Sequence, residues 1–518
     1  MTDHDVVVVG GGHNGLVCAA YLARAGLDVA VVEARADVGG CASTVAVDEL
    51  GARVNICNCD HLTFRTTPIA DELGLADHGL RYLDVEPAQL ALGWDGWAPW
   101  AFHHDVAATL DELRRTHPGE VDGYRRYLAA ARPVAELVLE LATAPPTLPR
   151  VARRLLDRRG RGATRLLAWS RRTAVDVLRS FFGSDALVAP PLTTGPAVWG
   201  ITGHHPHTGM AALGYALKHV AQVGRPEGGS GTLTDAIAAA FVPAGGQLLT
   251  NTRVTSILVE NNQTTGVTTE AAPERGAGFA PLSGAGSSRL RATRVVVACD
   301  PRKAFLEWLD APPPQLRDRW SKRPQPEGYE SKVDAVVAEP PRLPGYAGDL
   351  IPTAVVAPSP EALREAHRTM QAGRVTTQPP LLVNVPSVLD PTMRVGTDHV
   401  LSLEVLGTPY SLQGGWPGST EPQRWLDLLD LPAPVKAWRV MTPPDYERDF
   451  SLTRGHAPSF AGGPVAALLR RRDRELTRYR TPVRGLYLSG AATFPGAGVW
   501  GASGRNAAHV VVHDVGGA

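Results

Sequence analysis

Asp5-Val-Val-Val-Val-Gly-Gly-Gly-His-Asn-Gly15 is the stretch of sequence that decides the fold. Its four consecutive valines predict a buried parallel strand. Gly10, Gly12 and Gly15 then have the G-x-G-x-x-G spacing of a dinucleotide-binding turn. The apolar segment Leu16–Ala25 predicts the helix that should follow such a turn. Strand, turn and helix in this order predict a Rossmann-like α/β unit.

The glycines and the next strand each have a mechanical role. Gly10 permits the tight turn, Gly12 lets the backbone approach a pyrophosphate, and Gly15 lets the helix pack closely on the sheet. The free N–H groups at the helix N-terminus attract phosphates. A second apolar strand, Asp28–Val32, ends at Glu33, whose carboxylate is placed to accept hydrogen bonds from ribose hydroxyls.

The residues after Glu33 point to one cofactor. Ala34-Arg35 and the later pair Gly39-Gly40 resemble an extension found in the large FAD family that includes monoamine oxidase and phytoene desaturase. His13-Asn14-Gly15-Leu16 is similar to the phytoene desaturase and carotenoid ketolase branch of that family. The resemblance implies FAD, with non-covalent binding favoured. Cys41 also falls at this site, but many relatives carry arginine there, so its contact with the cofactor is left open.

Two later segments resemble other parts of the same family pattern. Gly228–Phe241 indicates a glycine turn and a helix, and it precedes Val254, whose counterpart in the family contacts the adenine through its backbone. Gly485–Gly501 indicates a strand and a glycine-rich loop, which in the family runs beside the isoalloxazine ring. From this loop the resemblance assigns to the cofactor site Gly490, Gly498, Val499 and Trp500.

The predicted fold class is α/β: a Rossmann-like FAD-binding domain with a second α+β substrate domain of antiparallel sheet and helices. We expect both domains to be built from separate pieces of chain. The FAD-binding parts are predicted at 1–85, 225–305 and 470–518. The substrate domain is predicted at 86–224, which is mainly helical, and at 306–469, which contains the strands Ser331–Ala338, Leu381–Val388 and His399–Leu406.

Composition excludes several classes of function. The 518 residues include 52 Lys plus Arg and 52 Asp plus Glu, so the net charge is 0 and general nucleic-acid binding is not expected. Five cysteines fit a reducing cytoplasm better than a disulfide scaffold. The sequence shows no apolar stretch long enough to span a bilayer and no hydrolase or kinase motif. These features favour a cytoplasmic oxidoreductase without a metal.

One cluster of chemically active side chains is Cys57-Asn58-Cys59-Asp60-His61. It has five interpretations: lining of the substrate cavity, buried core thiols, a zinc site, a redox pair, or a covalent flavin link. Zinc is disfavoured because structural zinc sites use four ligands with paired spacing, and no second pair is present. His61 is therefore a candidate catalytic residue by its expected place near the flavin.

Three further residues are candidates for catalysis. His207 belongs to His204-His-Pro-His207, which is either a general base or a solvated loop. His456 precedes the last FAD-binding segment, and the matching place in the resembling family faces the active site. Trp500 is expected to form a wall of the cavity near the flavin ring, or to pack in the core.

The segment Arg150–Ser180 carries ten Arg and two Asp, interleaved with apolar residues. One interpretation is a basic amphipathic surface that contacts a membrane or an acidic carrier protein. The other is a solvated helical face whose apolar stripe packs in the core. Between two strands, Ala271–Ser288 is rich in Gly, Ala and Ser and predicts a long loop.

The sequence thus favours hydride transfer at carbon on a hydrophobic substrate, such as a polyene, polyketide or isoprenoid, in bacterial specialised metabolism. The reaction would be a desaturation or a redox-linked cyclisation in a largely apolar cavity. Two alternatives remain: C–N oxidation with oxygen, as in amine oxidases, and a flavin-binding scaffold without turnover. The substrate, the electron acceptor and the oligomeric state are left open.

Overall fold

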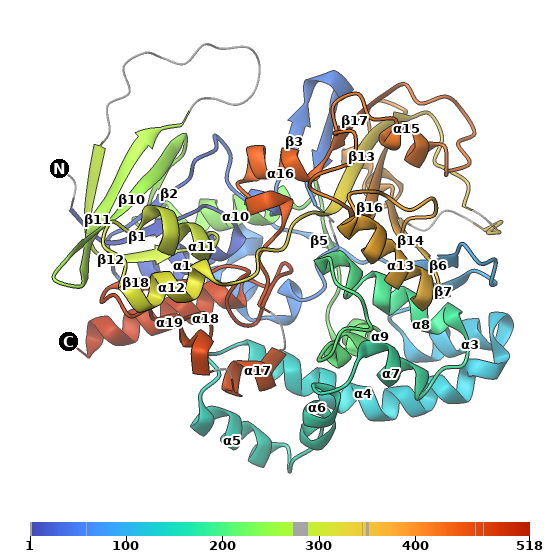
Figure 1. Ribbon diagram of the computed structural model, residues 1–518, viewed down its shortest axis with the longest axis horizontal. Helices are drawn as coiled ribbons and strands as arrows, with labels where there is room; N and C mark the ends of the chain where they lie inside the picture. The colour runs from blue at the N-terminus through green and yellow to red at the C-terminus, as the bar shows by residue number, and fades with distance from the viewer. Residues whose placement is uncertain are drawn as a thin grey trace.

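The computed structural model describes residues 3–57, 60–272, 288–343, 345–348, 352–460, 463–469 and 471–517. Cys59 and most of the predicted loop Ala271–Ser288 lie outside these residues. Among the described residues, no helix combines the length and the apolar character needed to cross a membrane. Two large sheets dominate the structure, one on each side of Figure 1.

The first sheet has the strand order β10-β11-β12-β1-β2-β9, with β18 paired to β12. β1 lies between β2 and β12 and is parallel to both, and its valines are buried on both faces. This confirms the buried parallel strand that the valine run predicts. The strands of this sheet are β1 (Asp3–Val9), β2 (Val29–Val32), β9 (Gln247–Leu249), β10 (Thr252–Glu260), β11 (Gln263–Ala271), β12 (Ser288–Val297) and β18 (Leu486–Leu488).

Three helices from distant parts of the chain pack together on one face of the first sheet. They are α1 (His13–Arg24), α10 (Gly231–Phe241) and α19 (Ala502–Gly516), which share one apolar core with β1 and β2. The loops before these helices therefore meet at one edge of the sheet, although they are far apart in sequence.

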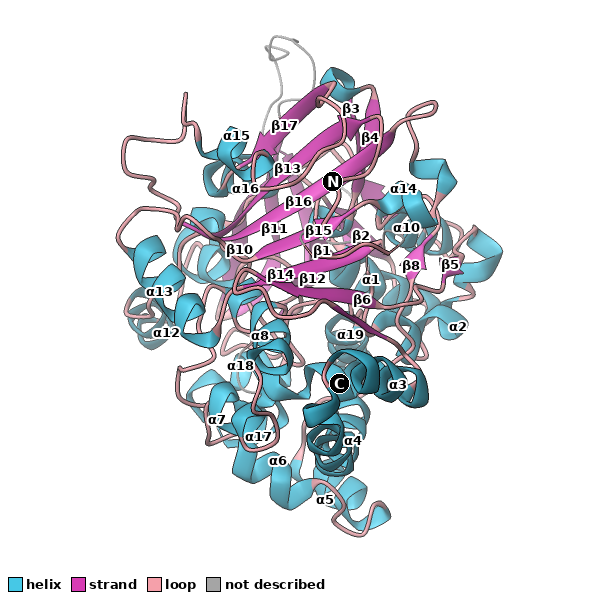
Figure 2. Cartoon of the chain, turned by 90° about the vertical axis from the view of Figure 1, so that its right-hand side faces the viewer, coloured by secondary structure: helices cyan, strands magenta, loops and turns pink. Residues whose placement is uncertain are grey.

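The second sheet has the order β17-β13-β16-β15-β14-β6-β7 and is antiparallel except for the pair β6 and β14 (Figure 2). β6 and β7 come from the segment for which the sequence predicts mainly helices. The strands are β6 (Gln89–Gly93), β7 (Trp100–Phe102), β13 (Tyr329–Val337), β14 (Thr353–Ala357), β15 (Leu381–Asn384), β16 (His399–Thr408) and β17 (Ala437–Met441). The predicted α/β class with a second α+β part is confirmed.

A helical layer covers the lower part of Figure 1. Its core contains the buried rings of Tyr124, Tyr127, Phe182 and Tyr215. Tyr127 donates a hydrogen bond to the carbonyl of Ala212 (2.6 Å), so its buried hydroxyl has a partner. The helices are α3 (Val106–Thr116), α4 (Val121–Ala142), α5 (Leu148–Asp157), α6 (Ala163–Trp169), α7 (Ala174–Arg179), α8 (Asp185–Thr193) and α9 (Gly214–Val220).

Short elements join these layers. The strands among them are β3 (Thr44–Val47), β4 (Ala52–Asn55), β5 (Tyr82–Leu83) and β8 (Arg225–Pro226). The helices are α2 (Ile69–Leu73), α11 (Pro301–Lys303), α12 (Pro314–Ser321), α13 (Pro360–Gln371), α14 (Pro386–Leu389), α15 (Glu421–Leu426), α16 (Pro443–Phe450), α17 (Gly463–Leu469) and α18 (Arg474–Arg478).

Gly15 lets α1 approach β1 closely. A Cβ atom at this position would lie 2.0 Å from the carbonyl oxygen of Gly10 and 3.1 Å from the Cβ of Ala298. Both obstacles belong to the sheet or to the turn that enters the helix, so neither moves cheaply. The close helix–sheet contact that the glycine spacing predicts is present in the structure.

We expect Gly15→Ala to lower the free energy of unfolding by about 2–3 kcal/mol, because the added methyl group overpacks the contact between α1 and β1. Urea unfolding measures this change. Gly119→Ala is the matched control, since a Cβ there would meet nothing within 4 Å. A Gly15→Ala protein as stable as the Gly119→Ala protein would contradict the packing argument.

Candidate active site

A cavity of about 1060 Å³ lies between the two sheets. One end is lined by the glycine turn after β1 and by the loop before α19, and the other by strands of the second sheet. The volume lies just above the roughly 300–1,000 Å³ of sites for single small ligands. The cavity is therefore large enough for an extended ligand that reaches from one sheet to the other.

Glu33 is held rigidly at the first end of the cavity. Its Oε2 accepts a hydrogen bond from the Gly11 N–H (2.7 Å), and its Oε1 accepts one from the Arg35 N–H (2.9 Å). The carboxylate is buried yet lines the cavity. It is thus preorganised to accept further hydrogen bonds from a ligand with hydroxyl groups.

Gly12 leaves open space for a ligand. A Cβ atom there would have the carbonyl oxygen of Gly39, at 3.9 Å, as its nearest neighbour in the protein. Gly12 is the N-cap of α1, so the free N–H groups of the helix face this space. The absence of a side chain at Gly12 serves the ligand, whereas the absence of one at Gly15 serves packing.

His13 and Asn14 connect the first turn to the C-terminal loop. The Nδ2 of Asn14 donates to the Nε2 of His13 (2.9 Å), and the His13 ring also bonds the backbone of Gly498. Burial lowers the pKa of His13 to about 4, so the ring is neutral at physiological pH. The Oδ1 of Asn14 is buried and has no hydrogen-bond partner among the described residues, which leaves an acceptor available to a ligand.

Most of the residues that the sequence assigns to the cofactor line this cavity. Gly15 instead lies in the helix–sheet contact. Trp500, expected as a cavity wall, is half-buried beside Gly498 and is not among the residues that line the cavity. The residues that line the cavity are Gly10, Gly12, His13, Asn14, Glu33, Ala34, Arg35, Gly39, Gly40, Cys41, Val254, Gly490, Gly498 and Val499.

The structure does not bring the predicted catalytic histidines together. His61 is fully buried, and its two ring nitrogens bond the hydroxyls of Tyr82 and Ser230, each at 2.8 Å. Burial lowers the pKa of His61 to about 3, which is typical of a neutral structural histidine. His207 is exposed on the surface, with Nδ1 near the carbonyl of Ser170 (3.2 Å).

His456 lies beside the cavity rather than in its lining. Its Nε2 is 3.4 Å from the carbonyl oxygen of Trp199, and its ring meets the ring of Tyr329 edge-on. Trp199 and Tyr329 themselves line the cavity. His456 therefore touches the wall residues and can position them.

Cys41 and Cys57 face each other in the cavity lining. Their thiols share a hydrogen bond, which lowers the pKa of Cys41, with help from Arg35, and raises the pKa of Cys57. The cavity-lining interpretation of Cys57 is thus the one that the structure matches. Among the described residues, no group of three or more His, Cys, Asp or Glu side chains could hold a metal ion.

Sequence reasoning missed a polar floor of the cavity. β13 and β16 alternate along their length, with buried apolar side chains on the outer face and polar side chains on the inner face. The polar residues are Glu330, Lys332, Asp334, Ser402 and Glu404. Polar residues at every second position of an otherwise apolar strand were the signal that could have identified them.

The floor holds its cations in ion pairs. Lys332 pairs with Asp334 and donates from Nζ to the carbonyl of Asn55 (2.6 Å). Arg439 on β17 also pairs with Asp334 (3.1 Å). Lys332 lies opposite Glu404 in the β13–β16 register. The floor is therefore a buried charged network within a cavity whose remaining lining is largely apolar.

Two glutamates of this floor line the cavity and are protonated more readily than usual. Burial, opposed by Lys332, raises the pKa of Glu404 to about 7. Burial and the nearby Glu404 raise the pKa of Glu330 well above its usual range. Such a pair can gain or lose a proton near neutral pH.

The rest of the cavity lining consists of a second set of polar side chains and an apolar wall. Lys218, whose pKa burial lowers to about 8, donates to Gln89, and both line the cavity. Asp60 pairs with the buried Arg225 (2.7 Å). The apolar side chains of the wall belong to Ile56, Leu62, Val198, Trp199, Val355 and Leu382.

Comparison with known proteins agrees with this architecture. A family model described as an NAD(P)-binding Rossmann-like domain matches residues 8–71. The mouse protein named pyridine nucleotide-disulfide oxidoreductase domain-containing protein 2 is 29% identical over 99% of this chain and 94% of its own length. A component of the limonene dehydrogenase of Castellaniella defragrans is 26% identical over 99% of this chain and 95% of its own.

Two further similarities concern the two branches of the resembling family. A lycopene-forming phytoene desaturase of Pseudescherichia vulneris is 27% identical over 50% of this chain and 51% of its own. The solved structure of a putrescine oxidase bound to putrescine superposes with a TM-score of 0.62 at 17% identity, covering 100% of this chain and 99% of that one. The latter likeness shows a shared fold.

We expect Glu404→Gln to change how stability depends on pH. The folded wild type holds the Glu404 proton up to pH about 7, whereas an unfolded carboxyl releases it near about 4.5. The stability that this proton contributes is complete below about 4.5 and is lost as the pH rises through about 7. Above pH 7 the glutamine variant, which cannot ionise, should therefore be the more stable protein.

Urea unfolding at pH 5 and pH 8 measures this difference. The control is Glu365→Gln on the exposed face of α13, which removes a carboxyl group outside the cavity. The assignment would be wrong if Glu404→Gln and Glu365→Gln had the same pH dependence.

Proposed function

We propose that this chain, an oxidoreductase of the superfamily that includes the phytoene desaturases and the amine oxidases, binds FAD non-covalently and transfers hydride between the flavin and a substrate carbon. The observation that carries the proposal is the cavity that joins a dinucleotide-binding turn to a separate sheet with a mixed lining. The end of the cavity at the glycine turn would hold the cofactor, and the end at the second sheet would hold the substrate.

The residues at the first end fit FAD. Gly12 leaves room for the pyrophosphate beside the N-terminus of α1, and Glu33 is fixed as an acceptor for ribose hydroxyls. The unpartnered Oδ1 of Asn14 can accept one more hydrogen bond. Val254 lines the same end of the cavity, where the adenine would lie.

The C-terminal loop fits the flavin ring. FAD, when bound, supplies the electron-accepting and electron-donating centre of the reaction. Gly498 and Val499 line the cavity just before α19, which has Gly501 as its N-cap. The positive end of the α19 dipole would stabilise negative charge in this region. His13, bonded to Gly498, holds the loop against the first turn.

The proposed substrate is hydrophobic over most of its length, such as an isoprenoid, polyene or polyketide of bacterial specialised metabolism. The apolar wall around Trp199, Val355 and Leu382 supports this, as do the substrates named by the limonene dehydrogenase and phytoene desaturase relatives. Desaturation and redox-linked cyclisation both begin with loss of hydride from carbon, so the same site serves either.

The second candidate function is C–N oxidation with oxygen. The carboxyls of Glu330 and Glu404 in the cavity favour it, because they could hold a substrate amine. Anaerobic incubation with amines and with isoprenoids, followed through flavin bleaching, separates the two functions. A flavin that no substrate or pyridine nucleotide reduces would favour a scaffold without turnover.

The cofactor assignment is tested by the visible spectrum of the purified protein before and after acid precipitation. We expect flavin absorption that passes into the supernatant, because binding is non-covalent. Colour retained in the pellet would show a covalent link, with Cys57, Cys59 and His61 as the first residues to replace. A protein that is colourless and takes up no added FAD would refute the proposal.

Gly12→Ala provides the matched variant. Its methyl group fits the protein but enters the space of the pyrophosphate, so FAD affinity should fall by about 2 kcal/mol, roughly 30-fold, while the unfolding free energy of the cofactor-free protein stays near that of wild type. Fluorescence titration with FAD measures the affinity. Unchanged affinity would show that the phosphates lie elsewhere.

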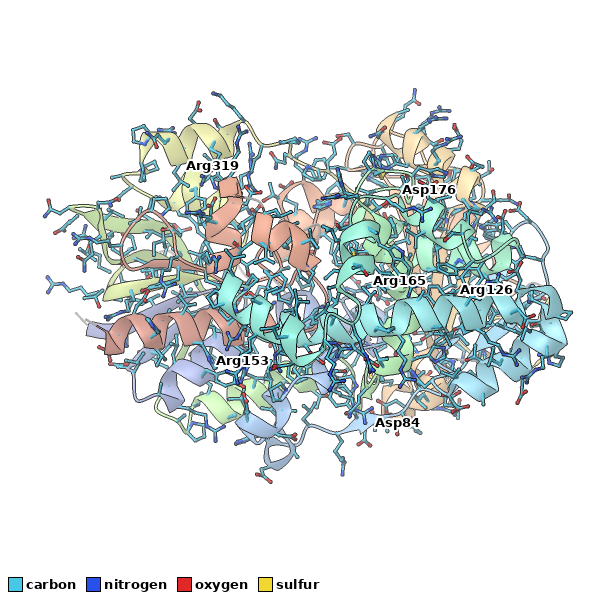
Figure 3. The ribbon with its side chains drawn as sticks, turned by 90° about the horizontal axis from the view of Figure 1, so that it is seen from below. Asp84, Arg126, Arg153, Arg165, Asp176 and Arg319 are labelled. Atoms are coloured by element: carbon cyan, nitrogen blue, oxygen red, sulfur yellow. The ribbon has the colours of Figure 1, made fainter. Side chains whose placement is uncertain are left out.

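We also propose that the basic helical surface contacts an anionic membrane, from which a hydrophobic substrate could be taken. Four leucines are exposed on α5, α6 and α17, which lie together at the lower end of both views: Leu148 (69% exposed), Leu156 (78%), Leu167 (41%) and Leu469 (68%). Figure 3 shows Arg153 and Arg165 on the same side of the molecule. Basic residues contribute about 1 kcal/mol each near such a surface.

Cosedimentation with phosphatidylglycerol vesicles tests this contact. We expect binding that disappears in neutral phosphatidylcholine vesicles and in the double variant Leu148→Ser, Leu156→Ser. Val242→Ser, at an exposed position on the first domain, is the control and should bind normally. No sedimentation with anionic vesicles would refute the membrane contact and leave two interpretations: an acidic carrier protein, or a solvated helical face whose apolar stripe packs in the core.

A further inference from the structure

Glu404 and Glu330 are buried carboxyl groups that line the substrate end of the cavity and belong to no motif of the dinucleotide site. We propose that this pair takes up the proton that the substrate releases, and that the substrate therefore presents a hydroxyl or amino group to it from the carbon that loses hydride. This inference rests on the proposed hydride transfer from a substrate carbon to FAD. It names a residue for proton transfer, and it selects an alcohol or amine as the reacting end of the substrate in place of the desaturation or cyclisation of a hydrocarbon.

The strand register places the two carboxyls side by side. β13 and β16 are antiparallel, with Glu330 opposite Leu406 and Lys332 opposite Glu404. Glu330 and Glu404 are thus diagonal neighbours on the same face of adjacent strands, at a Cα separation of about 7–8 Å that long side chains can bridge. Glu404 is 3% exposed and Glu330 is 7% exposed, and both contribute to the cavity lining.

The cations of the floor are already engaged. Lys332 pairs with Asp334 on its own strand, and Arg439 on β17 pairs with the same carboxylate. The other titratable groups that act on the glutamate pair are Asp60, Cys41, Cys57 and Tyr446, whose hydroxyl lies 3.4 Å from Glu330. None of these groups adds a positive charge. The charge of Lys332 lowers the pKa of both carboxyls, but burial outweighs it, so each pKa stays raised.

A purely hydrocarbon substrate would suit this floor poorly. Covering two carboxyl groups with apolar surface removes their water without replacing its hydrogen bonds, which disfavours binding strongly. A hydroxyl or amino group restores those bonds, because it can donate to a carboxylate and accept from a protonated carboxyl. The apolar wall would hold the rest of the same molecule.

The reaction balances with this assignment. A substrate with an H–C–X–H unit, where X is oxygen or nitrogen, loses two electrons and one hydrogen nucleus as hydride to FAD. The X–H proton passes to the Glu404 carboxylate, and the bond between carbon and X becomes double. A group whose pKa lies near neutral pH serves best for such transfer, and burial places Glu404 there.

Binding of three matched probes to the holoenzyme tests the substrate class. Menthol, menthylamine and menthane share one apolar skeleton and differ only in the polar group. The change in flavin absorption on titration gives the dissociation constant of each probe. We expect menthol or menthylamine to bind at least about tenfold more tightly than menthane, and this difference in affinity to disappear in Glu404→Leu. Equal binding of menthane, or no binding of either polar probe, would overturn the substrate class. Tighter binding of menthol would indicate an alcohol substrate, and tighter binding of menthylamine would indicate an amine substrate.

Infrared difference spectroscopy tests the proton without any turnover. The carbonyl-stretch band of a protonated buried carboxyl should disappear as the pH rises through about 7 in the wild type. It should be weakened or shifted in Glu404→Gln, and it should persist unchanged in Glu365→Gln, an exposed residue of α13. A band that is identical in wild type and Glu404→Gln would refute the assignment of the proton to this pair.

The outcomes separate this inference from the proposed function. If FAD binds normally while Glu404→Gln leaves the infrared band and probe binding unchanged, the inference alone fails. If the protein takes up no FAD, the proposed function fails, and the infrared titration still reports on the carboxyl pair. Glu404→Asp keeps an acid at this position, so it should retain a titrating band if the glutamine variant proves unstable.

Discussion

The close approach of α1 to β1 at Gly15 is the contact on which the rest of the structure depends. Because no side chain separates Gly15 from the carbonyl of Gly10, the N-terminus of α1 points directly at the edge of the first sheet. A second close contact follows, since a Cβ at Gly504 of α19 would lie 2.2 Å from the carbonyl oxygen of Asn14. Two helices from opposite ends of the chain are thereby held with their N-termini at one cavity, where positive dipole ends favour a phosphate-bearing and a negatively charged ligand.

The second sheet solves a different physical problem. Its outer face is a continuous apolar core, and its inner face carries charged residues that water cannot reach freely. Buried side chains stay charged only where ion pairs and hydrogen bonds offset the loss of hydration. Asp334 forms ion pairs with both Lys332 and Arg439. Glu330 and Glu404 lie at the margin of that network, against the cavity. A protein that needed only stability would gain little from placing them there, so the arrangement suits a site where a proton moves.

The cofactor end of the cavity could be predicted residue by residue, whereas the substrate end could not. Glycine spacing, the acid at position 33 and the loop around Gly498 describe contacts with a ligand whose shape is constant, and each contact lies close in sequence to a strand and a helix. The sequence makes His61 and His456 candidates by their expected place near the active site, and His207 a candidate as part of a histidine cluster in a loop. His61 lies outside the cavity lining because it is buried and bonded to two hydroxyl groups, and His207 lies outside it because it is exposed on the surface. Neither property is visible in the local sequence.

By itself the sequence determined the Rossmann-like unit, the buried valine strand and most of the residues that line the proposed cofactor end of the cavity. Those features follow from short-range spacing and the limited conformations of strand, turn and helix. Only the tertiary structure decided which polar side chains share a cavity. Glu330 and Glu404 are 74 residues apart, and they become neighbours through the register of β13 with β16. Burial raises the pKa of both carboxyls, and the charge of Glu404 adds to the rise at Glu330. The chemistry of the substrate end is therefore a property of long-range strand pairing, which the sequence encodes but does not display at any one place.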